Sequence, residues 1–84
     1  MKQILETIIN KAALLGLPSV DINNAQDFLK HHEFGLCLEI IIGQAYEHNI
    51  KIDKEFYLLV MDATQKMNIP AEKIDFIKEL LRKT

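Results

Sequence analysis

Apolar residues recur at intervals of three and four along most of the chain, which is the spacing of amphipathic α-helices. The longest such stretch covers about residues 33–48. At about 100° per residue, its apolar arc contains Phe34, Gly35, Leu38, Ile41, Ile42, Ala45 and Tyr46. The opposite arc is acidic, but it is interrupted by Leu36, Cys37 and Ile40. The pattern therefore predicts a central helix covered on both sides, either by helices of the same chain or by a partner.

The first helix is predicted from about Lys2 to Leu15, with an apolar face formed by Ile4, Leu5, Ile8, Ala12 and Leu15. Gly16 is expected to end this helix because glycine adopts the left-handed conformation of a helix C-terminus without strain. Pro18 is expected to prevent the helix from resuming. A polar turn is therefore expected next, over residues 19–24.

A short second helix is predicted over about residues 24–31. Its start is indicated by Asn23 and Gln26, which have the spacing of a capping box. Gly35 follows a few residues later, and glycine has low helix propensity. We therefore expect Gly35 to mark a tight junction between this helix and the central one.

Two more helices are predicted towards the C-terminus. An extended connection at residues 50–52 leads to Asp53, a good N-cap for a fourth helix that Asn68 closes. Pro70 suits the first turn of a fifth helix, whose buried stripe contains Ile74, Ile77 and Leu81, with Phe76 and Leu80 beside them. No alternating β pattern occurs. Residues 1–84 are thus predicted to form a single domain, an all-α bundle of about five helices.

The size of the chain limits what it can enclose. Its 84 residues, 49% of them hydrophobic, suffice for one core. An enclosed substrate cavity of about 300 Å³ or more would strain such a core, so we expect a surface binder without a cofactor rather than an enzyme. The lone Cys37 excludes an internal disulfide and fits a reducing compartment. No stretch approaches the roughly 20 apolar residues of a membrane span, so a cytoplasmic protein without membrane contact is expected.

The net charge of −2 is unevenly distributed. Residues 21–62 carry eight acids and three lysines, a balance of −5, whereas the segments before and after them carry +1 and +2. Phosphate contacts require a basic surface, so the acidic middle argues against nucleic-acid binding. It is compatible with a basic protein partner. Carboxylates that only keep a small domain soluble would give the same distribution.

Metal and nucleophile chemistry is disfavoured by the spacing of the residues that it needs. The histidines and Glu33 invite a metal interpretation, but adjacent histidines on a helix point about 100° apart, and no His-x-x-x-His pair occurs. Cys37 and His32 lack a third group that would orient a base. Ser19, the only serine, lacks the preceding acid of a carrier-protein attachment site. We therefore expect no metal site and no catalytic residue, and the histidines are expected to be polar residues at helix ends.

Glu39, Gly43 and Glu47 recur every four residues along one side of the predicted central helix. Gly43 would leave a flat notch between two carboxylates, with Leu36 and Ile40 beside it. An apolar centre bordered by acids is typical of an interface for a basic partner. The alternative is that Gly43 allows a neighbouring helix to approach closely.

A longer stretch of the chain resembles a group of small bacterial immunity proteins. Residues 28–39 read FLKHHEFGLCLE, and the family pattern has Phe-Leu, a polar step with an acid, and aromatic-Gly-Leu-Ala-Leu-Glu. The resemblance covers about residues 24–69 and continues through Tyr46-Glu47, Ile50 to Ile52, Glu55-Phe56-Tyr57 and Met67-Asn68-Ile69. Cys37 replaces the usual alanine, and Asn68-Ile69 lacks the customary glycine. The group includes the MafI-type and certain contact-dependent growth inhibition (CdiI-type) immunity proteins.

The resemblance implies a cytoplasmic antidote that binds the C-terminal toxin domain of a secreted protein, often an RNA-cleaving nuclease, and blocks its active cleft. On its own the antidote is expected to be a monomer. An acidic surface suits such a partner because an RNA-binding groove must be basic. The candidate toxin-binding residues are Asp27, Glu33, Glu39, Tyr46, Glu47, Glu55, Tyr57 and Asp62. The alternative function is a self-associating helical adaptor or regulator with Leu36 and Ile40 at a homodimer seam.

Overall fold

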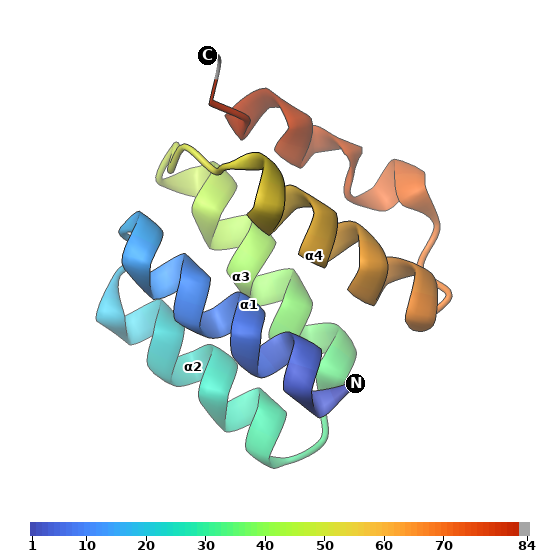
Figure 1. The fold of residues 1–84 in the computed structure, drawn as a ribbon. Helices are drawn as coiled ribbons and strands as arrows, with labels where there is room; N and C mark the ends of the chain where they lie inside the picture. The colour runs from blue at the N-terminus through green and yellow to red at the C-terminus, as the bar shows by residue number, and fades with distance from the viewer. Residues whose placement is uncertain (83–84) are drawn as a thin grey trace.

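The computed structural model describes residues 1–82, which form four α-helices followed by two short 3₁₀ helices (Figure 1). The elements are α1 (Lys2–Leu15), α2 (Ser19–Lys30), α3 (Phe34–Glu47), α4 (Lys54–Lys66), η1 (Ala71–Lys73) and η2 (Asp75–Leu80). Among these residues, β pairing is limited to one isolated parallel bridge between Ile52 and Leu81. The prediction of a small all-α domain is confirmed.

Helices α1 and α3 share the centre of the molecule. Helix α1 packs against α2, α3 and α4, and α3 packs against α1, α2 and η2. In Figure 1, α1 and α2 lie side by side, α3 runs partly behind α1, and α4 lies with the C-terminal segment on the other side. Their common core includes Leu5, Ile8, Leu38, Ile41, Phe56 and Val60. Burial of one such side chain contributes about 1.5–3 kcal/mol, so this core holds the helices together.

All four α-helices end in the same way. A residue with positive φ follows each of them: Gly16 (109°), His32 (58°), Asn49 (51°) and Asn68 (56°). The next amide donates a hydrogen bond to a carbonyl five residues earlier, at 2.8–3.0 Å, from Leu17 to Ala12, Glu33 to Phe28, Ile50 to Ala45 and Ile69 to Thr64. This Schellman arrangement satisfies carbonyl groups that the last turn leaves free. Gly16 and Asn68 thus end α1 and α4 as predicted.

Helix α2 begins at Ser19 rather than near residue 24. Pro18 is its N-cap, with φ −57° and ψ 146°, and the Pro18 carbonyl accepts hydrogen bonds from the amides of Asp21 (3.0 Å) and Ile22 (3.1 Å). A proline at a helix start costs nothing, because the N–H that it lacks would have no partner there. The predicted turn over residues 19–24 and its capping box were therefore wrong, since these residues lie inside α2.

The predicted fifth α-helix is instead the pair of 3₁₀ helices η1 and η2. The buried side chains of this segment are spaced by three, which matches the 3.0 residues per turn of a 3₁₀ helix. They are Ile74, between the two helices, and Ile77 and Leu80 of η2. The amide of Ile52 donates to the carbonyl of Leu80, and the amide of Arg82 donates to the carbonyl of Ile52, both at 2.9 Å. This pairing holds the end of the segment against residues 50–52 and places Leu80, rather than Leu81, in the core.

The predicted start of α4 is confirmed, whereas the role predicted for Gly35 before α3 is wrong. Asp53 caps α4 as predicted, since its Oδ1 accepts a hydrogen bond from the Phe56 amide at 2.7 Å. Gly35 was expected at a junction, but it lies in the first turn of α3. The left-handed residue His32 makes the junction between α2 and α3, so Gly35 is not needed for the turn.

Candidate partner-binding face on helix α3

One side of α3 is left uncovered by the rest of the described chain. We name this side the α3 face; it consists of Leu36, Glu39, Ile40, Gly43, Tyr46 and Glu47, which share one arc at 100° per residue. Leu36 and Tyr46 are 44% and 45% exposed despite their apolar bulk. The opposite side of the helix is buried, and Cys37, Leu38 and Ile41 are at most 1% exposed. Of the two predicted ways to cover the second side of α3, the helices of the described chain therefore do not provide one, and cover by a partner stays a prediction.

Gly43 lies at the middle of the α3 face. Among the described residues, a Cβ atom built on Gly43 would have no other atom within 4 Å, apart from its own helix backbone and chain neighbours. The alternative that this glycine allows a second helix to approach closely is therefore wrong. Gly43 instead leaves an open notch in the surface, with Glu39 and Glu47 one helical turn to either side.

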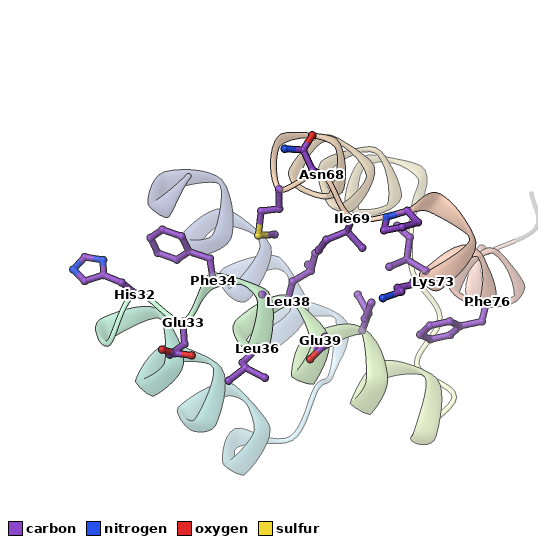
Figure 2. Close-up of a pocket in the computed structure, with 15 residues that line it drawn as sticks. His32, Glu33, Phe34, Leu36, Leu38, Glu39, Asn68, Ile69, Lys73 and Phe76 are labelled. Carbon is purple, nitrogen blue, oxygen red and sulfur yellow. The ribbon is translucent and has the colours of Figure 1, made fainter.

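An open groove of about 850 Å³ adjoins the α3 face (Figure 2). On one side it is lined by α3, through Gly35, Leu38, Glu39 and Ile42. On the other side it is lined by residues between Met67 and Phe76, and Figure 2 shows Ile69, Lys73 and Phe76 there. Most of the lining side chains are apolar. The groove therefore continues the exposed apolar surface of α3 towards the C-terminal segment.

Two acidic residues line this groove. Glu33 and Glu39 are both exposed, and neither forms an ion pair within residues 1–82. Lys73 is the single lysine or arginine in the lining. The groove and the α3 face together therefore carry three carboxylates, those of Glu33, Glu39 and Glu47, against one lysine.

Tyr46 connects the α3 face to the C-terminal segment. Its ring packs edge to face on Phe76 of η2, with ring centroids 5.1 Å apart and planes at 83°. Such contacts contribute about 0.5–1.5 kcal/mol beyond area burial. Tyr46 was predicted on the inner arc of the helix, but almost half of it is exposed. A partner would therefore meet a ring that is already held in place.

The structure places four of the eight candidate residues along α3: Glu39, Tyr46 and Glu47 on the α3 face, and Glu33 in the adjoining groove. Asp27 is exposed on α2 and does not line the groove beside α3. Tyr57 is half-buried on α4, where it lines a second groove of about 430 Å³ with Leu58 and Leu81. These two residues therefore lie outside the α3 face and its groove.

The remaining two candidates, Glu55 and Asp62, form ion pairs within the molecule. Lys11 Nζ lies 2.9 Å from Glu55 Oε1, and this hydrogen bond raises the pKa of Lys11 above its usual value. Lys66 Nζ lies 3.4 Å from Asp62 Oδ2, one turn along α4. The paired lysines offset the charges of Glu55 and Asp62. These two carboxylates therefore attract a basic partner less than the acids of α3 do.

Asp21 contributes to the negative balance of the sequence but not to the acidic surface. It is only 7% exposed, in the first turn of α2, and His48 Nε2 lies 3.5 Å from its Oδ2. That oxygen has no hydrogen-bond partner among the described residues. Sequence reasoning missed this burial because it treated residues 19–24 as an exposed turn.

The residues considered for metal or nucleophile chemistry are placed elsewhere. His31 and His48 are helix C-caps, and His32 follows the end of α2. Within residues 1–82, no three His, Cys, Asp or Glu side chains are grouped so that they could hold a metal ion. Cys37 is fully buried, and burial raises the pKa of its thiol to about 11. This thiol is therefore protonated at neutral pH and is a packing residue of the core.

Comparison with known proteins adds no relative. No protein-family model matches the chain, and no curated protein or solved structure is significantly similar to it. The resemblance of residues 24–69 to immunity proteins therefore stays a prediction. Among the described residues, no helix is long and apolar enough to cross a membrane.

The open space at Gly43 predicts that Gly43→Ala stabilises the protein. The added methyl meets no neighbour, and alanine in a helix interior is more stable than glycine by about 0.5–1 kcal/mol. Urea denaturation followed by circular dichroism would measure the change. Gly16→Ala is the matched control, because φ of 109° at Gly16 makes alanine strained there and should lower stability by about 1 kcal/mol. A loss of stability in Gly43→Ala would show that a neighbour packs on this site.

The burial of Cys37 predicts slow reaction with a thiol reagent. With a pKa of about 11, roughly one thiol in a thousand is ionised at pH 8, and the thiolate is the reactive form. We expect labelling by 5,5′-dithiobis(2-nitrobenzoate) to be far slower in the native protein than in urea. Raising the pH towards 11 should accelerate the native reaction. Native labelling as fast as that of the unfolded chain would contradict this burial.

Proposed function

We propose that this chain is a protein-binding domain that presents the α3 face to a basic protein partner, and that it acts as an immunity protein. The observation that carries the proposal is an uncovered helix face with exposed Leu36 and Tyr46, an open glycine, and Glu39 and Glu47 without an ion-pair partner within residues 1–82. An apolar centre within a charged rim is the usual anatomy of a protein interface.

The partner that this surface favours is a toxin domain with a basic active cleft, as in an RNA-cleaving nuclease. Acidic residues around the α3 face repel phosphate and attract lysine and arginine. A standard interface takes about 800 Å² from each partner, which is roughly a sixth of the 5269 Å² surface of this chain. The domain is thus large enough to occupy a cleft as a stoichiometric blocker. The resemblance to immunity proteins supports this class of partner and a cytoplasmic location.

The electrostatic part of the proposal is tested in two steps. The first step is to find, directly upstream of this gene, a gene for a large secreted protein, and its absence would count against the proposal. The second step is to measure binding to the C-terminal domain of that protein. Glu39→Lys and Glu47→Lys should each slow association with that domain by about three- to tenfold at low salt, because rim charges act on encounter rates. The effect should largely vanish at high salt. Stopped-flow fluorescence would measure the rates.

Glu6→Lys is the matched control for these two variants. Glu6 is exposed on α1 and outside the α3 face, and its reversal changes the net charge by the same amount. We expect it to slow association less than either α3 variant does. Equal effects from all three would show that only net charge matters and would remove Glu39 and Glu47 from the site.

The competing function is a self-associating adaptor, and the observation that favours it is the exposed Leu36 beside the half-buried Ile40. Two copies meeting across Gly43 would bring Glu39 of one copy towards Glu47 of the other, and like charges oppose such contact. We therefore expect a monomer in sedimentation velocity at low and at high salt. A tight dimer with no affinity for the upstream toxin domain would favour the adaptor.

A further inference from the structure

We infer that the groove between α3 and residues 67–76 receives an amphipathic helix of the protein partner. Apolar side chains of that helix enter the groove, and a lysine or arginine beside them pairs with Glu33 and Glu39. This inference rests on the proposed function and deepens it. It names the kind of segment that the partner offers and the part of the site that holds it.

The shape and lining of the groove suit apolar side chains. Its floor includes Leu38, Ile42 and Ile74, which are buried in the core. Its walls include Phe34 and Ile69, which are only half-buried and would lose further exposed surface to an occupant. A volume of about 850 Å³ lies within the size range of ligand sites, roughly 300–1,000 Å³. The groove therefore has room for a few large side chains.

A helix fits this groove better than an extended strand does. A strand is recognised through free backbone groups at a sheet edge, and the α3 wall has its backbone bonded internally. The other wall also uses its amides, since Lys73 bonds to Pro70 and Ile74 to Ala71, both at 3.0 Å. Recognition is thus left to side chains. On α3 these follow one stripe, from Gly35 through Glu39 to Ile42.

The charges of the groove favour a basic helix. Glu33 and Glu39 have no ion-pair partner among the described residues, and Lys73 alone opposes them. A basic side chain of the inserted helix would pair with Glu33 or Glu39, which are exposed at the groove, and the bound partner would exclude water around that pair and so strengthen it. The same acids disfavour RNA and fatty-acid carboxylates as occupants.

Gly35→Leu tests the groove without disturbing the core. Gly35 lines the groove and has a helical φ, and a Cβ added to it meets no neighbour within 4 Å. The new side chain should compete with the inserted helix. We expect the Kd for the upstream toxin domain to rise by roughly 30-fold or more, mainly through faster dissociation. Ala13→Leu is the control, because Ala13 is exposed on α1 and lines neither groove.

A second variant and a direct readout keep the test independent of folding. Lys73→Glu removes the opposing charge, so it should speed association several-fold at low salt, an effect that lost stability would not produce. In the wild-type complex, methyl NMR signals of Ile42, Ile69 and Ile74 should shift, whereas that of Leu58, in the second groove, should not.

The outcomes separate this inference from the proposed function. If Gly35→Leu binds like the wild type while Glu47→Lys, which lies on the α3 face outside the groove lining, still slows association, the partner contacts the α3 face but not the groove, and only the groove inference is overturned. Unshifted methyl signals of Ile42 and Ile69 in the complex would overturn it as well. If the wild-type chain does not bind the toxin domain, both proposals fail.

Discussion

Helix α3 carries apolar side chains around most of its circumference, and the chain has too few helices to cover all of them. Helices α1 and α2 bury the side that holds Cys37 and Ile41, and η2 covers part of the next side. Leu36 and Tyr46 remain exposed as a consequence. The exposed apolar surface of the protein thus follows from the same helix that supplies much of its core.

The C-terminal segment decides the shape of that exposed surface. Its end is held by the two hydrogen bonds between Ile52 and the Leu80–Arg82 backbone, and its apolar residues enter the core at intervals of three. The segment therefore lies beside α3 without closing over it, and the space between them is the groove of Figure 2. Packing of Phe76 on Tyr46 joins the two sides of this space.

The acidic side chains have different surroundings in different parts of the molecule. Glu55 and Asp62 are neutralised by neighbouring lysines, and Asp21 is buried near His48. Glu33, Glu39 and Glu47 have no such partners within the described residues, and they border the apolar surface of α3. These three carboxylates therefore border the surface where an interface is proposed.

The sequence by itself determined the helical class, the bounds of α1, α3 and α4 to within a few residues, and the caps at Gly16, Asp53 and Asn68. These features depend on local spacing and on the conformations that single residues allow. The start of α2, which Pro18 caps, also depends on the local sequence. The prediction was wrong there because a proline can begin a helix as well as end one.

Only the tertiary structure decided the rest. The end of the C-terminal segment is held by pairing with Ile52, almost thirty residues earlier in the chain. Whether Gly43 is open, and which acids have lysine partners, depends on where neighbouring elements lie. Such contacts join residues that are distant in sequence, so periodicity and composition carry no information about them.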